Sequence, residues 1–136
     1  MASTPVQQGR ALLDAFNARD LSQWRRQLAS DFTASYPGLR DCPNAEAAEA
    51  FNAPFLAAFS DLHFQVRLSA AEGERLIYLW TGRGTHDGPL VSPAGTLPPS
   101  GKSGGVDGVL ISTVRDGRIV REETYWNIPD LLAQIS

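Results

Sequence analysis

The spacing of hydrophobic residues changes once along the chain, close to Asp61. Before this point, apolar residues recur every three or four positions, as they do on one face of an α-helix. After it, apolar and polar residues alternate, as they do in a strand with one buried face. The pattern predicts helices over about residues 4–17, 21–29 and 44–58, a short strand over 32–36, strands over 63–68 and 76–86, a hairpin over 106–127 and a last helix over 129–135.

Capping and turn residues mark the ends of several of these elements. Thr4, Asp20 and Asn44 each precede a helical pattern, and their side-chain oxygens are suited to accept the free N–H groups of a first helical turn. The pair Asp116-Gly117 tolerates positive φ at low cost, which favours a tight turn between two strands. These residues predict three capped helices and one two-residue hairpin.

The order of the elements predicts an α+β domain rather than a parallel βαβ sheet, because helices come first and strands follow. Short turns join the strands, so the sheet is expected to be antiparallel. Residues 39–43 and 88–105 are expected to be loops, the second because it contains four prolines and five glycines. We expect a single domain over residues 1–136, with a cone-shaped curved sheet, three N-terminal helices packed on its concave face, a short C-terminal helix and a conical cavity between them.

Two strands carry further information about burial. Phe64, Val66 and Leu68 alternate with polar residues, which predicts one buried face. The strand over 76–86 is apolar on both faces around Tyr78, which is typical of a central strand covered on each side. Helices cover only one of those faces, so the pattern predicts a homodimer through the outer face of the sheet.

Composition and charge narrow the range of partners. The chain of 136 residues is 43% hydrophobic and 20% charged, with a net charge of −3 and no basic stripe, so nucleic acid is not an expected partner. Cys42 is the single cysteine, so no internal disulfide forms, and no Cys/His cluster predicts a metal site. The N-terminus lacks a signal-peptide pattern and no apolar run of about 18 residues occurs, which predicts a cytoplasmic protein without a membrane span.

Several phrases, taken in order, resemble the SnoaL-like polyketide cyclases, in the ester-cyclase branch of the nuclear-transport-factor-2-like superfamily. The resemblance covers nearly the whole chain. It rests on Trp80-Thr81-Gly82-Arg83-Gly84-Thr85-His86-Asp87-Gly88, Pro98-Pro99-Ser100-Gly101-Lys102, Asp116-Gly117-Arg118-Ile119, Tyr125-Trp126-Asn127 and Leu131-Leu132-Ala133-Gln134-Ile135.

The resemblance implies a cone-shaped α+β barrel, a homodimer formed through the sheet and a pocket for a small apolar or carbonyl-containing molecule. It also implies closure of a polyketide ring by an aldol step without a metal or organic cofactor. In that reaction an acidic side chain at the end of the last strand moves the proton. Here Asn127 stands where that acid is expected, and an amide cannot act as a general base. Ser35 stands where a related segment often has histidine.

Three residues are candidates for catalysis. Asn127 is suited to hydrogen-bond a ligand oxygen, or else to cap the last helix. Asp107 lies beside the end of the last strand as a replacement acid. A two-residue turn pairs position 107 with Trp126 and directs Asp107 away from Asn127, whereas a bulge at the turn reverses this. His86 titrates near neutrality in its unperturbed state, and its alternative role is to brace the loop that follows it.

Six residues are candidates for ligand contacts, each with an alternative structural role. The Tyr125 hydroxyl requires a polar partner when it is buried, which a ligand or the core supplies. Ser35 and Tyr36 are expected at the mouth of the cavity. Large aromatic residues at helical or strand spacing form either the pocket wall or the core; they are Trp24, Trp80 and Phe55.

Two functions follow from these candidates. The first is a cofactor-independent cyclase or isomerase acting on a carbonyl compound, with Asp107 or His86 handling protons and Asn127 and Tyr125 polarising an oxygen. The second is a non-catalytic ligand-binding or dimeric scaffold protein of the same fold, which the amide at Asn127 favours.

Overall fold

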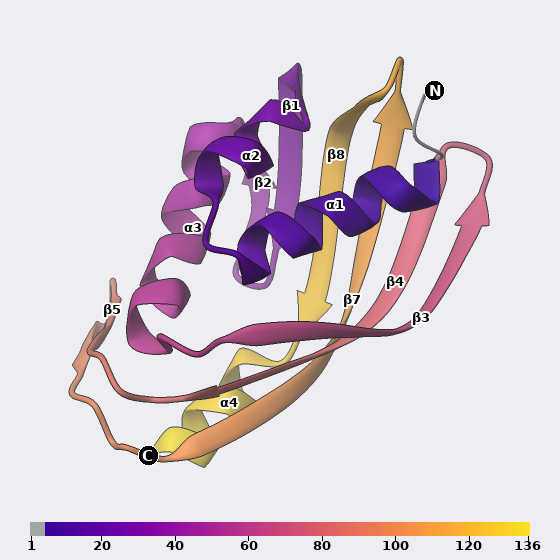
Figure 1. The fold of residues 1–136 in the computed structure, drawn as a ribbon. Coiled ribbons are helices and arrows are strands. Elements are labelled where there is room, and N and C mark those ends of the chain that lie inside the picture. The colour runs from indigo at the N-terminus through magenta and orange to yellow at the C-terminus, as the bar shows by residue number, and fades with distance from the viewer. Residues whose placement is uncertain (1–4) are drawn as a thin grey trace.

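The computed structural model describes residues 5–136, with side chains described from residue 10 onward. The expected cap at Thr4 lies outside the described residues. The α+β prediction is confirmed, because helices, a curved six-stranded sheet and a two-stranded hairpin make up this part of the chain (Figure 1). The elements are α1 (Pro5–Asn17), α2 (Leu21–Arg26), β1 (Leu28–Tyr36), β2 (Leu39–Cys42), α3 (Ala45–Ala58), β3 (His63–Glu72), β4 (Arg75–Thr85), β5 (Leu90–Ser92), β6 (Gly95–Leu97), β7 (Ser103–Arg115), β8 (Arg118–Trp126) and α4 (Ile128–Ile135).

Six strands form the main sheet in the order β2-β1-β8-β7-β4-β3. The three N-terminal helices lie on its concave side, with α1 crossing the strands, and α4 lies at the end where β8 stops (Figure 1). All neighbouring strands are antiparallel except β1 and β8, which run parallel. The expectation of a wholly antiparallel sheet was therefore wrong at this pair. A short turn makes two strands that follow one another in the sequence run antiparallel. Most of the chain lies between β1 and β8, so their connection does not impose a direction.

The β7–β8 hairpin turns at Asp116-Gly117 as predicted, and both residues have positive φ, at 52° and 77°. The register shifts by one residue between Thr113 and Val114, so Gly108 lies opposite Trp126. The predicted pairing of residue 107 with residue 126 was wrong because of this β-bulge, which places an extra residue in β8. The bulge decides which side chains of β8 face inward.

The two faces of the sheet differ in character. On the concave face, Leu76, Tyr78 and Trp80 of β4 are buried against the helices and against Phe32 of β1 and Leu110 of β7. The outer face carries aliphatic side chains that the chain itself leaves partly or largely uncovered: Leu68, Ile77, Leu79, Val109 and Ile111. Leu68 was predicted to be buried, but the bulge between Val66 and Leu68 turns it outward, where it is 63% exposed.

Three segments differ in kind from the predictions. Leu28 begins β1 instead of ending α2, whose last residue is Arg26. The segment predicted as a loop over 39–43 forms the edge strand β2. Residues 88–105 include the hairpin of β5 and β6 and the first residues of β7. In each case the strand gains its hydrogen bonds from a neighbour, and local composition does not report such neighbours.

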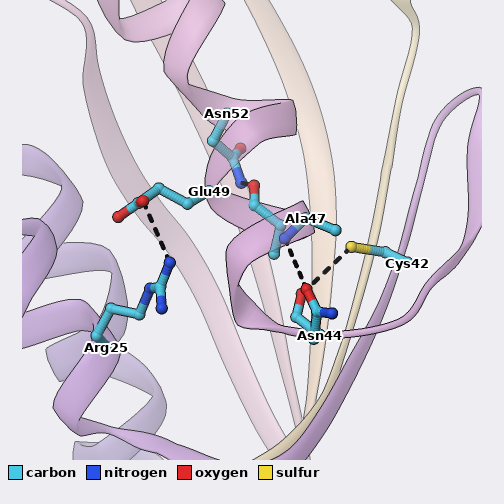
Figure 2. Close-up of polar contacts among 7 residues, drawn as sticks. Arg25, Cys42, Asn44, Ala47, Glu49 and Asn52 are labelled. Carbon is cyan, nitrogen blue, oxygen red and sulfur yellow. Dashed lines mark hydrogen bonds and ion pairs between the residues drawn. The ribbon is translucent and has the colours of Figure 1, made fainter.

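Helix α3 begins at Ala45 and is capped as predicted by Asn44, whose side-chain oxygen accepts the Ala47 N–H at 2.8 Å (Figure 2). The same view shows Arg25 of α2 reaching Glu49 of α3 at 3.2 Å, which ties the two helices together. The Asn52 amide, one turn further along α3, donates to the Ala48 carbonyl at 2.9 Å. These contacts fix the helix that supplies one wall of the cavity.

The junction between α1 and the sheet is held by polar side chains. Arg19, at a positive φ of 60°, donates to the carbonyls of Phe59, Ser60 and Leu62 at 2.9–3.1 Å. Asn17 pairs with both backbone groups of Phe64 at 2.8 and 2.9 Å. The helix end and the α3–β3 connection therefore form one rim of the cavity. None of the helices in the described part of the chain has the length and apolar character to cross a membrane.

Candidate functional site

An apolar cavity lies between the helices and the concave face of the sheet. Its empty space is about 870 Å³ when the open solvent at its mouth is counted. Only about 80 Å³ of it admits the centre of a water molecule, so the interior is narrow. Its walls are mostly apolar and include the aromatic side chains of Phe16, Phe55, Phe59, Phe64, Trp80 and Trp126.

Glu122 of β8 brings a carboxyl group to the wall of this cavity. Its side chain faces inward because the bulge places Glu122, Thr124 and Trp126 on the concave face. Glu122 is only 4% exposed. Burial away from water disfavours the charged form and raises the pKa of Glu122 from 4.5 to about 7. The carboxyl group therefore exchanges its proton close to neutral pH.

Two hydroxyl groups partly offset the burial of this carboxyl group. The Tyr36 hydroxyl and the Thr124 hydroxyl each donate to Glu122 Oε1 at 3.4 Å. Both distances are long for O–H···O hydrogen bonds, which cluster near 2.7–2.8 Å. These donors favour the ionised form only weakly, and burial remains the dominant influence on the pKa of Glu122.

The second oxygen of the same group differs from the first in its hydrogen bonding. Glu122 Oε2 has no hydrogen-bond partner among the described residues, although it is buried. The hydroxyl of Ser112, directly opposite on β7, is also buried and lacks a partner within that part of the chain. Burying an unpaired polar atom costs about 1–3 kcal/mol. A group that bonded Oε2 would recover part of that cost, so the site is suited to a ligand with a complementary polar atom.

Tyr36 is itself held rigidly. Its ring stacks on Phe51 with centroids 4.5 Å apart and planes 3° from parallel. Burial, together with the nearby Glu122 carboxyl group, raises the pKa of Tyr36 well above its usual range, so the hydroxyl keeps its proton. A side-chain hydrogen bond from Asn52 acts in the opposite direction. Tyr36 is therefore a fixed hydrogen-bond donor beside the carboxyl group.

The sequence model of the SnoaL-like polyketide cyclases matches residues 7–135. The chain belongs to this family. A comparison with curated protein sequences finds no match.

Solved structures share the fold of this SnoaL-like chain. IdmH, a candidate polyketide cyclase from Streptomyces antibioticus, aligns with a TM-score of 0.80 at 26% identity, over 97% of this chain and 98% of that one. A candidate SnoaL-like polyketide cyclase from Jannaschia sp. CCS1 gives 0.81 at 22% identity, over 100% and 97%. AclR, a candidate hydroxylase from Streptomyces galilaeus, gives 0.82 at 23% identity, over 96% and 80%. The differing names show that the shared fold does not define one reaction.

Three of the predicted ligand residues line the cavity of this SnoaL-like protein. Phe55 and Trp80 form part of its aromatic wall, and Tyr36 contributes its hydroxyl beside Glu122. Trp24 does not line the cavity; it is fully buried against Phe16 and Phe32 in the core.

Asn127 and the two other predicted residues near it lie elsewhere. Asn127 is exposed and caps α4, since its side-chain oxygen accepts the Asp130 N–H at 2.9 Å. Tyr125 is 53% exposed on the outer face, where its hydroxyl donates to Glu123. Ser35 faces an outer recess that Tyr125 also lines. The alternation of β8 thus directs the predicted pair outward and Glu122 inward.

The other two catalytic candidates are also outside the cavity lining. Asp107 lies on the outer face, where it accepts from the Thr81 hydroxyl at 2.6 Å and lies 3.6 Å from Arg67. His86 is buried beside Phe59, and its Nδ1 accepts the Ser100 N–H at 3.2 Å. His86 therefore holds the loop that follows β6, which matches the alternative role considered for it.

Sequence reasoning missed Glu122. The hairpin pattern contained a usable signal, because Glu122 and Thr124 alternate in phase with Trp126. The prediction that Asn127 and Tyr125 face the pocket instead placed the odd-numbered residues of the strand there. No group of three or more His, Cys, Asp or Glu side chains is arranged to hold a metal ion within the described residues.

A first prediction concerns Asn127. Its replacement by Ala removes the cap of α4 and is expected to lower the free energy of unfolding by about 1 kcal/mol. Asn127→Asp keeps an oxygen acceptor at the same position and is expected to leave stability nearly unchanged. Urea unfolding of the three proteins at neutral pH measures both differences. An equal loss in both variants would contradict the capping role.

A second prediction concerns the pKa of Glu122. The folded protein holds this proton up to about pH 7, whereas the unfolded chain releases it near 4.5. The folded state therefore binds more protons in that window, and stability falls as pH rises through it and levels off above. Relative to that of Glu122→Gln, the free energy of unfolding of the wild type should fall by on the order of 3 kcal/mol between pH 4 and pH 8.

Urea unfolding across that pH range tests this, with Glu72→Gln as the matched control because Glu72 is exposed on β3. The stability of Glu72→Gln should depend on pH in the same way as that of the wild type. If the difference between wild type and Glu122→Gln does not change with pH, the carboxyl group has an ordinary pKa and the description of the site is wrong.

Proposed function

We propose that the cavity binds a small, neutral carbonyl compound and that Glu122 transfers the proton in an aldol-type ring closure of it, without a cofactor. The observation that carries this proposal is a buried carboxyl group with a pKa near 7 and one unpaired oxygen at the wall of an apolar cavity. A general base is most effective when its pKa lies near the working pH.

The step balances without any added reactant. The Glu122 carboxylate takes a proton from the carbon next to one carbonyl group, and the resulting enolate carbon bonds to a second carbonyl carbon of the same molecule. The oxygen of that second carbonyl becomes an alkoxide. Glu122 then returns the proton to the alkoxide, so the product is a cyclic isomer of the substrate. One carboxyl group serves as base and then as acid, and for this it must be able to lose and regain a proton at the working pH.

The surrounding groups suit this sequence. Tyr36 and Thr124 donate to Oε1 of Glu122, and Oε2 has no partner among the described residues, so it is left to bond a substrate. A hydrogen bond from Tyr36 also stabilises the carboxylate when it is formed. The walls are mostly apolar, and such surroundings strengthen electrostatic interactions with developing charge on the substrate.

The charge of the lining indicates the kind of ligand. Among the described residues that line the cavity there is no lysine, arginine or histidine. An anionic group placed inside would lie in an apolar environment without a counter-charge and would be strongly disfavoured. The cavity therefore favours a neutral molecule over a carboxylate or a phosphate.

The alternative is a carrier of the same ligand class that performs no chemistry. The nearly complete apolar lining favours it, since such walls provide affinity without orienting a reaction. The two functions separate experimentally, because a carrier binds the ligand and releases it unchanged.

A third prediction tests catalysis at Glu122. Glu122→Gln cannot exchange a proton and is expected to lose about 10²–10⁴-fold in turnover of a model poly-β-ketone. Wild-type turnover should rise with pH through about 7 as the base form appears. Product formation followed by chromatography and mass spectrometry gives both results. Asp107→Asn is the matched control, because Asp107 is an exposed carboxylate on the outer face, and it should retain wild-type activity.

Three further results test the assignment of the base, the choice between the two functions and the role of Asn127. Loss of turnover with Asp107→Asn but not with Glu122→Gln would overturn the assignment of the base. Ligand binding by the wild type without any turnover would favour the carrier. Asn127→Asp should not raise activity, because residue 127 caps α4 outside the cavity.

We also propose that two copies of the chain pair through the outer face of the sheet. Leu68, Leu79 and Val109 lie in one row across three neighbouring strands, with Ile77 and Ile111 in the next row. Exposed aliphatic rows of this kind mark interaction surfaces. Arg67 and Asp107 lie on the same face, and they offer opposite charges to a copy related by a two-fold axis.

A fourth prediction tests this assembly. Light scattering at micromolar concentration should give a mass near twice the 14.7 kDa of one chain. Ile77→Lys places a charge in the aliphatic rows and should give a monomer. Leu97→Lys is the control, because Leu97 is an exposed aliphatic residue on β6, away from this face, and should leave the dimer intact. A wild-type monomer would contradict the proposal.

A further inference from the structure

The indole of Trp80 lies directly over the backbone of Gly108. The two residues face each other across β4 and β7. A Cβ atom built on Gly108 would lie 2.2 Å from one ring atom of Trp80 and 2.6 Å from two more. Real Cβ atoms do not approach other heavy atoms so closely, so the ring occupies space that any other residue at position 108 would need. The indole ring therefore packs directly against the backbone of Gly108.

The same ring is part of the cavity wall. Trp80 lines the cavity and is only 3% exposed. Phe64 contacts it edge to face, with centroids 5.1 Å apart and planes at 85°. The depth of the cavity at this point is set by how closely the indole lies against the sheet.

The backbone below the ring has little freedom to retreat. β7 lies inside the sheet, paired with β4 on one side and β8 on the other, and Gly108 has a partner on both strands. Moving that backbone would break the ladder on two sides, whereas moving the indole breaks none of it. A side chain at position 108 would therefore lift the Trp80 ring away from the sheet, toward the open space of the cavity.

We propose that the Trp80–Gly108 pair determines ligand size at this site: glycine lets the indole lie flat and so sets how large a ligand the cavity accepts. The inference rests on the proposed function in taking the cavity as the ligand site. Glu122, buried at the same wall with an unpaired oxygen, is the independent sign that this cavity receives a ligand.

The test uses three variants of the full chain. Gly108→Ala raises the ring and narrows the cavity. Trp80→Phe replaces the indole with a smaller ring and widens it. The double variant combines the added methyl group at position 108 with the smaller ring at position 80. There is room for both, so the cavity should return to a depth close to that of the wild type.

The probes are three neutral aryl methyl ketones of increasing size: acetophenone, 2-acetylnaphthalene and 2-acetylanthracene. Binding is measured by isothermal titration calorimetry, which does not depend on tryptophan fluorescence. Gly108→Ala should weaken the largest ketone that the wild type binds by about tenfold or more relative to acetophenone. Trp80→Phe should shift preference toward the larger ketones, and the double variant should return to within about threefold of the wild-type preference.

Gly105→Ala is the matched control. Gly105 lies on the same strand but faces the other way, where an added Cβ meets the flexible Arg83 side chain at 3.2 Å. It should keep the wild-type size preference. Thermal unfolding of every variant shows whether it folds, and if Gly108→Ala does not, Trp80→Phe and the double variant still test the pair.

The outcomes separate the two proposals. If the wild type binds the ketones and no variant changes their relative affinities, the inference about Trp80 and Gly108 is overturned and the proposed function stands. If the wild type binds none of them, the proposed ligand class fails. Crystal structures of Gly108→Ala and Trp80→Phe then decide the inference, which requires a raised indole with a smaller cavity in the first and a larger cavity in the second.

Discussion

A carboxyl group is buried on the concave face of the curved sheet, at the wall of the cavity. Glu122 is almost completely shielded from water and, among the described residues, receives two long hydrogen bonds, so its proton is held until about pH 7. Leaving such a group unpaired reduces stability, and a protein of this size has only about 5–15 kcal/mol of stability in total. Keeping a destabilising group at the wall of a cavity is typical of a functional site rather than of a packing role.

The rest of the fold maintains that environment. The polar contacts of Arg19 and Asn17 fix the rim where α1 meets the α3–β3 connection, and Asn44 fixes the start of α3. Gln134 of α4 pairs with both backbone groups of Gly105 at 2.9 Å, which holds the last helix against β7. Asn17 and Gln134 thereby join α1 and α4 to the sheet, beside the apolar residues that line the cavity.

The residues that face the cavity follow from sheet register, and register is where sequence reasoning was least complete. Hydrophobic periodicity and capping residues were enough to predict the helices at α1 and α3, the β7–β8 turn and the α+β class. They were not enough to predict the bulge near Val114 or the one near Leu68, because a bulge arises from the fit between two strands. A shift of one residue exchanges the two faces of a strand, which is why Glu122 rather than Asn127 lies inside.

The sequence by itself determined most of the helices and long strands, the family and the aromatic residues available for a pocket, since these depend on local spacing and on phrases that occur in order. Tertiary structure decided which side chains share the cavity. Tyr36, Glu122 and Trp80 come from three strands that are distant in the sequence, and only the strand order brings them together. The raised pKa of Glu122 has the same origin, because burial is a property of the assembled core and not of residue type.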